Sequence, residues 1–243
     1  HSPAIPLKPS PTRFGGTLHN GFANESMIDE VARAVGADPL QYRLDLLAPG
    51  KRERGCLELV ADKAGWNLPL AAGASGTRRG RGVAVTPSHR SYSACVAEVT
   101  VRPDHRWTLD RVVVAIDCGL VINPDNLRAQ IEGATAFALS LGRYSAVTVK
   151  DGEAQERYFD EYRITRIHTM PQVEGYFVPS TQGPSGAGET IGSSVIPAIA
   201  NALADATGIR LRKLPLRLPG EPPEAGWERP ARLHHGAQVR APA

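Results

Sequence analysis

The first third of the chain carries apolar residues at the intervals of amphipathic helices. The pattern predicts three helices, over 25–36, 38–47 and 55–66. Asp38 and Pro39 supply the N-cap and the first residue of the second helix. A glycine follows the last apolar position of the other two, as expected where a helix ends. The apolar positions concerned are Met27, Val31 and Ala34 in the first helix and Leu57, Val60 and Ala64 in the third.

After a loop rich in Gly and Arg over 70–82, the pattern changes to that of strands. Short apolar runs and alternating segments, many of them rich in Val, predict strands bounded by turn residues. Asp151 and Gly152 mark the turn of a hairpin within 146–159. The other predicted strands are 82–87, 93–101, 107–119, 173–180 and 210–216.

Two further helices are predicted within this strand region. Asn123 and Pro124 begin the first, whose apolar stripe contains alanines and therefore allows another element to approach closely. The second follows the loop 182–189 and ends at Gly208. The stripes are Leu127, Ile131, Ala134, Ala138 and Leu141 in the first helix, and Ile196, Ile199, Leu203 and Ala206 in the second.

These elements predict an α+β fold within 243 residues, a length that suits one large domain or two closely packed ones. We expect a Pro-rich extended arm over 1–12, a helical segment over 13–78, and strands interleaved with helices over 79–218. The segment 219–243 is rich in Pro, Gly, Ala and Arg and has almost no apolar periodicity. We predict that it is a disordered tail.

Composition narrows the functional classes. The net charge is only +3, and the arginines are spread along the chain. The sequence therefore lacks the clustered basic residues that a nucleic-acid-binding surface needs. The three cysteines lie far apart in the sequence. This spacing indicates buried apolar side chains rather than a disulfide framework. No apolar run is long enough for a membrane span, and no signal peptide is visible. The chain begins at His1 without an initiator Met, so we expect any signal that decides between periplasm and cytoplasm to lie upstream.

One carboxylate has an unusual setting. Within 182–203 Glu189 is the only acidic residue before the last helical pattern, and glycines surround it. The helix dipole would stabilise its ionised form by about 0.3–1 kcal/mol, whereas burial in an apolar pocket can raise a carboxyl pKa by up to ~3–5 units. A closed site would thus make Glu189 a base near neutral pH. The alternative is a solvated residue that caps its own helix.

Five segments, in order along the chain, resemble the molybdenum-binding large subunit of the xanthine dehydrogenase and aldehyde oxidase family. The likeness is greatest to the isoquinoline 1-oxidoreductase β-subunits and extends from about Arg13 to Leu216. Because the family's subunit is much longer, we expect this chain to correspond to its C-terminal portion. The five segments are 13–16 (RFGG), 25–43, 115–134, 185–189 (SGAGE) and 196–216.

The resemblance implies a role for each residue that matches the family's motifs. In such enzymes the glutamate of the G-x-G-E loop removes the proton of a water-derived hydroxyl that attacks an electron-poor carbon, so Glu189 would be the general base. Gln130 would hydrogen-bond the pterin, although an ordinary polar helix residue would look the same. The loop residues Gly186, Ala187 and Gly188 would let the backbone approach the metal, and Arg13 and Gly16 would lie beside its pocket.

The resemblance also implies cofactors and partners. The cofactor would be molybdenum with molybdopterin, in the cytosine dinucleotide form, and the substrate an aromatic N-heterocycle or an aldehyde. Electrons would leave through 2Fe-2S clusters on a small iron-sulfur partner protein, with a cytochrome c as a further acceptor. No residue of this chain is predicted to ligate a metal.

Departures from the family leave other interpretations open. Gly15 stands where a larger apolar residue is common, Thr190 replaces the proline that often follows the glutamate, and further glycine-rich cofactor segments are not visible. A cofactor-free remnant or scaffold that binds partner subunits would also explain these features. An unrelated nucleotide-binding module fits poorly, because Glu189 would repel a phosphate. Asp117, Cys118 and Asn123 are assigned structural roles.

Overall fold

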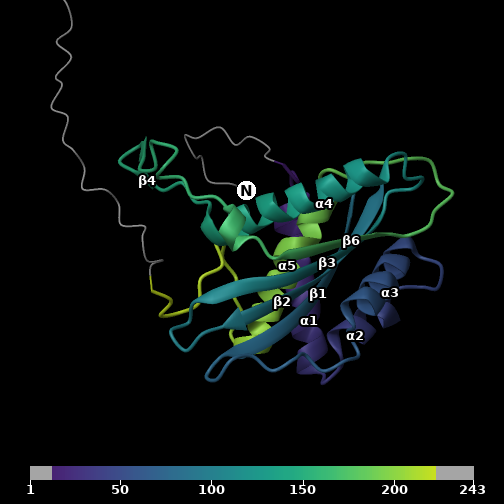
Figure 1. The fold of residues 1–243 in the computed structure, drawn as a ribbon, viewed down its shortest axis with the longest axis horizontal. Coiled ribbons are helices and arrows are strands. Elements are labelled where there is room, and N and C mark those ends of the chain that lie inside the picture. The colour runs from purple at the N-terminus through teal and green to yellow at the C-terminus, as the bar shows by residue number, and fades with distance from the viewer. Residues whose placement is uncertain (1–12, 223–243) are drawn as a thin grey trace, which may run out of the picture.

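The computed structural model of the chain describes residues 13–222. The predicted arm 1–12 lies outside this range, as does the predicted tail apart from residues 219–222. Figure 1 shows helices on both sides of one twisted sheet. The helices are α1 (Thr17–Ala34), α2 (Pro39–Leu46), α3 (Arg52–Ala64), α4 (Pro124–Leu139) and α5 (Thr190–Thr207), with a π-helical turn (Ser140–Tyr144) and a 3-10 turn (Ile167–Thr169). The strands are β1 (Arg78–Ser88), β2 (Ser91–Val101), β3 (Trp107–Asp117), β4 (Val149–Lys150), β5 (Glu153–Ala154) and β6 (Gln172–Phe177).

The main sheet has the strand order β1-β2-β3-β6. The first three strands are antiparallel neighbours, and β6 joins β3 in parallel after the α4 connection. The short pair β4–β5 forms the hairpin predicted around Asp151 and Gly152. This mixture of helices and strands confirms the predicted α+β class.

Alternate residues of the central strands enter two different cores. Along β2, Cys95 and Ala97 face the layer that contains α5 and α4. Ala94 and Val96 face the opposite layer, where α2 and α3 pack. Because successive side chains of a strand point to opposite faces, a strand buried on both faces has a nearly continuous apolar sequence. The helices α2 and α3 thus share a core with the sheet.

The contact between α5 and β1 depends on two glycines. A Cβ at Gly80 would lie 2.2 Å from the Ala202 carbonyl oxygen, and one at Gly82 would lie 2.2 Å from the Ala202 nitrogen. The bare backbone of β1 therefore accommodates the backbone of α5. The prediction of a loop over 70–82 was wrong for residues 78–82, because β1 begins at Arg78. Glycine, usually unfavourable within a strand, marks here a close approach of another backbone.

Helix α1 contains most of the helix predicted over 25–36, but it begins earlier, at Thr17, and it buries a different face. Met27 and Val31 are 53% and 37% exposed, whereas Glu25 and Asp29 are almost fully buried. The buried acids have partners from elsewhere in the chain: Glu25 pairs with Arg43, and Asp29 with Arg210. The apolar stripe expected from the sequence therefore faces solvent in this structure.

The strand predicted over 210–216 is absent, because these residues pair with no strand of the described chain. Instead, Arg210 Nη2 lies 2.5 Å from Asp29 Oδ2, and Arg212 Nη2 lies 2.7 Å from Glu30 Oε1. These ion pairs hold the segment along α1. Pro215 also lacks the N–H that a ladder requires.

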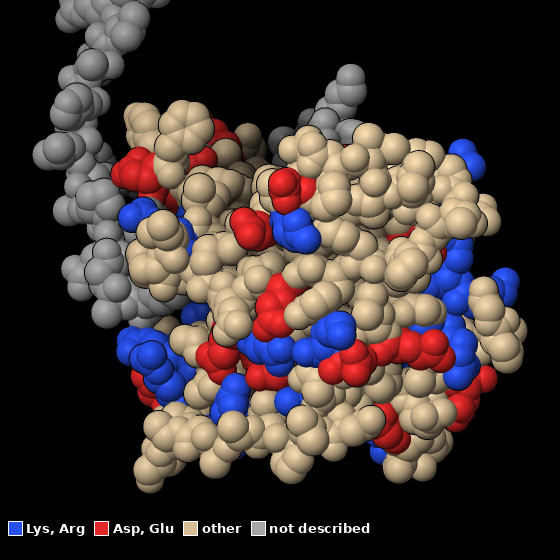
Figure 2. Space-filling model, turned by 45° about the vertical axis from the view of Figure 1, so that its right-hand side comes forward, with Lys and Arg blue, Asp and Glu red and all other residues tan. Residues whose placement is uncertain are grey.

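The three cysteines are free and buried, as predicted. Burial raises the pKa of the Cys56 thiol to about 12 and that of Cys95 still further. Among residues 13–222, no helix combines the length and the apolar character needed to cross a membrane. Figure 2 shows basic and acidic side chains mixed on the face in view, without a separate basic stripe.

Candidate functional site

The first turn of α5 places the predicted base at the rim of the sheet. Glu189 occupies the N-cap position of this helix, and the loop Gly186–Gly188 leads into it. Further along the first turn, Gly192 faces the Phe14 ring, where a Cβ would lie 2.1 Å from Phe14 Cζ. The fully buried Phe14 thus anchors the first described loop against the start of α5.

Arg13, Gln130 and Gly188, which are far apart in the sequence, meet beside Glu189. Arg13 Nε donates to the Gly188 carbonyl at 3.0 Å, and Arg13 Nη2 donates to Gln130 Oε1 at 2.9 Å. A Cβ at Gly188 would lie 3.2 Å from Gln130 Oε1, so a larger residue would crowd the Gln130 oxygen that accepts from Arg13. The structure therefore brings together four of the residues singled out from the sequence.

The remaining predicted site residues lie along the same loops. Gly16 precedes α1 as its N-cap residue, and nothing lies within 4 Å of a Cβ built on it. Ala187 is half-buried and packs against the main core. The Phe14 and Gly15 backbones both have positive φ, 77° and 47°, so the loop next to Arg13 makes a tight left-handed turn.

The Glu189 carboxylate is 43% exposed, and its Oε2 lies 3.3 Å from His89 Nε2. Residues 13–222 do not bury it in the water-poor cleft that the sequence argument invoked. The carboxylate is instead about half exposed, and Arg13, which also bonds Gln130, donates to the carbonyl of the adjacent Gly188.

Thr190 ties the loop to the sheet. Its hydroxyl is fully buried and lies 2.9 Å from the Ser88 carbonyl and 3.2 Å from the Gly186 carbonyl. A proline at this position could not make either bond. The hydroxyl thus connects the beginning of α5 to the end of β1 and to the glycine loop.

Asp117 supports the same loop from the end of β3. It accepts hydrogen bonds from Arg52 Nε at 2.7 Å and from the Gly119 amide at 3.0 Å. Burial alone would raise the pKa of the Asp117 carboxyl, but the hydrogen bonds from Arg52 and Gly119 and the charge of Arg52 outweigh it, and the pKa is lowered. The adjacent Cys118 carbonyl accepts from the Ser185 amide at 2.9 Å. The structural role predicted for Asp117 thus has a physical basis.

A lowered pKa in the folded state means that ionised Asp117 stabilises the fold above the unfolded value, near 3.9, and that this contribution is lost as the pH falls through the folded pKa. We expect Asp117→Asn to lower the free energy of unfolding by about 1–2 kcal/mol at pH 7. The difference from the wild type should shrink below about pH 4. Urea unfolding at several pH values measures this, and a difference that stays constant with pH would contradict the assignment.

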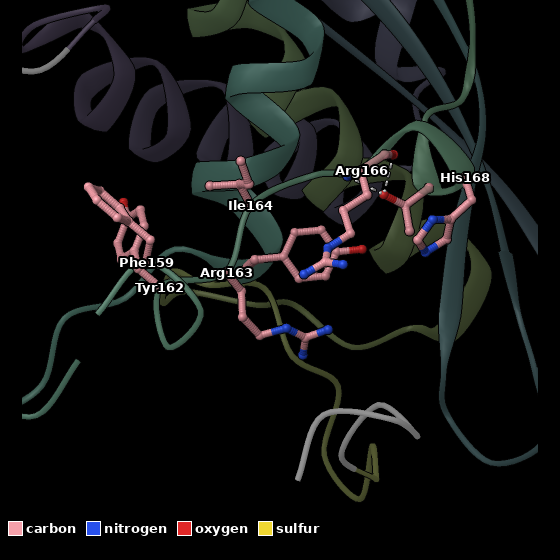
Figure 3. A pocket seen from close by; sticks show the side chains of 8 residues that line it. Phe159, Tyr162, Arg163, Ile164, Arg166 and His168 are labelled. Carbon is pink, nitrogen blue, oxygen red and sulfur yellow. Dashed lines mark hydrogen bonds between the residues drawn. The ribbon is translucent and has the colours of Figure 1, made fainter. Parts of the chain in front are cut away.

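A separate pocket of about 360 Å³ lies between the π-helical turn and the 3-10 turn. Figure 3 shows Phe159 and Tyr162 at one end and His168 at the other, with Arg163 and Arg166 between them. None of the predicted site residues lines it. Within residues 13–222, no group of three or more His, Cys, Asp and Glu side chains could hold a metal ion.

His89 is the neighbour of Glu189 that sequence reasoning missed. His19, the histidine that lies nearest to the first loop in the sequence, is exposed on α1. A usable signal was present: two strand patterns, predicted over 82–87 and 93–101, flank His89 and Arg90 at the spacing of a hairpin. This pattern predicts that His89 lies in the turn at the end of the sheet. It does not predict that the turn lies beside α5.

Comparisons with known proteins show the family to which this chain belongs. Residues 40–171, more than half of the chain, match the family model described as molybdopterin cofactor-binding domain. The chain is 34% identical over 203 residues to the isoquinoline 1-oxidoreductase β-subunit of Brevundimonas diminuta, covering 83% of this chain and 26% of that protein. It is 34% identical over 213 residues to a nicotinate dehydrogenase subunit of Pseudomonas putida, covering 82% and 18%.

A solved structure shares the fold at low sequence identity. Quinoline 2-oxidoreductase from Pseudomonas putida superposes with a TM-score of 0.74 at 13% identity, covering 84% of this chain and 51% of that one. The chain therefore belongs to the molybdopterin cofactor-binding domain family, as the resemblance predicted. It spans about a quarter of the length of the isoquinoline 1-oxidoreductase chain that it matches.

Proposed function

We propose that this chain is the part of a molybdenum hydroxylase that carries the general base. The proposed enzyme oxidises an aromatic N-heterocycle or an aldehyde, with water as the source of oxygen. The observation that carries the proposal is the meeting of Arg13, Gln130 and Gly188 beside Glu189. Family membership and the names of the relatives, which are oxidoreductases of heterocycles, support the same interpretation.

The residues at this site fit a pterin cofactor. Gln130 is exposed and its Oε1 is occupied by Arg13, while its amide nitrogen donates to no residue within 13–222, which leaves it free for a heterocyclic acceptor. Gly186 and Gly188 let the backbone come close to a ligand. When bound, a molybdenum cofactor supplies the two-electron acceptor for oxidation of the substrate carbon. We infer its cytosine dinucleotide form, and 2Fe-2S clusters on a partner subunit, from the family.

Glu189 would act as the base in this scheme. One carboxylate oxygen takes the proton that water loses as its oxygen joins the substrate carbon. Arg13 positions the loop through the Gly188 carbonyl, and Thr190 fixes the helix that carries the base. In the proposed full-length enzyme, surfaces outside residues 13–222 would shield the half-exposed carboxylate from water.

The test is Glu189→Gln in the full-length enzyme. Gln keeps the size of the side chain but cannot take the proton, so kcat should fall by roughly 10²–10⁴-fold, the usual contribution of general-base catalysis. Turnover of heterocycles and aldehydes is measured together with the molybdenum content. Glu132→Gln, an exposed glutamate on α4, is the matched control and should keep the wild-type rate.

Two outcomes would contradict the proposal. A Glu189→Gln enzyme with full molybdenum loading and an unchanged rate would exclude Glu189 as the base. A wild-type enzyme that binds neither molybdenum nor pterin would favour the cofactor-free scaffold instead.

A further inference from the structure

The hairpin between β1 and β2 ends in an unusual turn next to Glu189. Ser88 pairs with Ser91, so His89 and Arg90 form a two-residue loop. Their φ angles are 51° and 63°, the left-handed region that such turns require and that Gly and Asn adopt most easily. A histidine held in this conformation is a local departure from turn preferences, and such departures cluster at functional sites.

The ring of His89 contacts a side chain through each of its nitrogens. Nδ1 lies 2.7 Å from Ser88 Oγ, and Nε2 lies 3.3 Å from Glu189 Oε2. If the Ser88 hydroxyl donates to Nδ1, the proton of the neutral ring must be on Nε2 and point toward the carboxylate. In that arrangement Ser88 sets the tautomer that lets His89 donate to Glu189.

The turn is attached to the loop that carries the carboxylate. The Gly186 amide donates to the His89 carbonyl at 3.3 Å. A Cβ at Gly186 would lie 2.8 Å from His89 Cβ, so the glycine makes room for the histidine. The buried Thr190 hydroxyl joins the Ser88 carbonyl to the same helix start. These contacts hold the backbone of the turn against the start of α5, and they bring the imidazole and the carboxylate within reach of each other.

We propose that His89 is a positioning residue for Glu189, a role that rests on the proposed function of Glu189 as the base. The Nε2–H of the neutral imidazole donates to one carboxylate oxygen and holds the group in place, leaving the other oxygen to face the reacting water. Arg13 also holds this loop, through its hydrogen bond to the Gly188 carbonyl.

Two substitutions in the full-length enzyme separate positioning from folding. Asn suits the left-handed turn better than His but is too short to reach Glu189, so we expect His89→Asn to fold and to lose roughly tenfold in kcat with little change in KM. Gln can place an amide N–H where Nε2–H lies, so His89→Gln should recover most of the rate. Molybdenum content should equal that of the wild type in both. A His89→Asn enzyme as fast as the wild type would overturn the proposal.

A second measurement needs no turnover. Nitrogen-15 NMR of the histidines in the 243-residue chain reports which ring nitrogen carries the proton. We expect neutral His89 to be protonated at Nε2, and Ser88→Ala to shift the balance toward Nδ1. A ring protonated at Nδ1 in the unmodified chain would overturn the proposal. If Glu189→Gln keeps its full rate while the NMR result holds, the proposed function fails but the contact stands.

Discussion

Gly82→Ala is expected to lower the free energy of unfolding by about 3 kcal/mol, at the upper end of the cost of overpacking a core. The added Cβ would lie 2.2 Å from the Ala202 nitrogen and 2.3 Å from the Ala198 carbonyl oxygen. Both are backbone atoms of α5, so no side-chain rotation relieves the clash and the helix must move away from β1. For a chain of this size the melting temperature should fall by roughly 6–12 °C.

Gly133→Ala is the matched control for this change. Gly133 lies within α4, and nothing is within 4 Å of a Cβ built on it. Alanine is favoured over glycine in a helix by about 1 kcal/mol, so this variant should be slightly more stable. Thermal and urea unfolding measure both changes. Equal stability of the two variants would show that the contact between α5 and β1 is not tight.

Arg43→Met is expected to cost about 3–5 kcal/mol, because it leaves a buried carboxylate without its cation. Arg43 and Glu25 are 2% and 5% exposed, and Arg43 Nε lies 2.8 Å from Glu25 Oε2. The same guanidinium donates to the carbonyls of Pro39 and Glu25. Glu25 Oε2 also accepts from the Val85 amide at 3.0 Å, so this pair joins α1, α2 and β1.

A double variant identifies the cause. Adding Glu25→Gln to Arg43→Met removes the buried charge yet keeps an oxygen for the Val85 amide. The double variant should therefore be more stable than Arg43→Met alone. Arg128→Met, at an exposed ion pair on α4, should change stability little. A double variant no more stable than the single one would argue against the unpaired charge as the cause.

Elements with a single buried face were predictable from the sequence. In α4, Leu127, Ile131 and Ala134 are buried as their spacing predicted, and Asn123 caps the helix through a bond from the Asn126 amide. The predictions that failed share one cause: contacts with residues far away in the sequence determine the structure there. In α1, Glu25 and Asp29 are buried because arginines from other segments meet them, and nothing local to the helix indicates this.

The candidate site was predictable from the resemblance and not from periodicity. Hydrophobic spacing says nothing about which loops meet, whereas the order of family motifs points to Arg13, Gln130 and Gly188 without any knowledge of their contacts. His89 escaped because it belongs to none of those motifs. The sequence left the exposure of Glu189 open between a buried base and a solvated residue at the helix start, since it depends on which surfaces cover the first turn of α5.

Because Gly80 and Gly82 let β1 contact the main chain of α5 directly, near Ala198 and Ala202, backbone atoms rather than side chains set the spacing between this helix and the sheet. Core side chains can change size among Val, Ile and Leu without altering that spacing. Evolution can therefore retune the hydrophobic interior of this chain while Glu189, the proposed base, keeps its place at the start of α5.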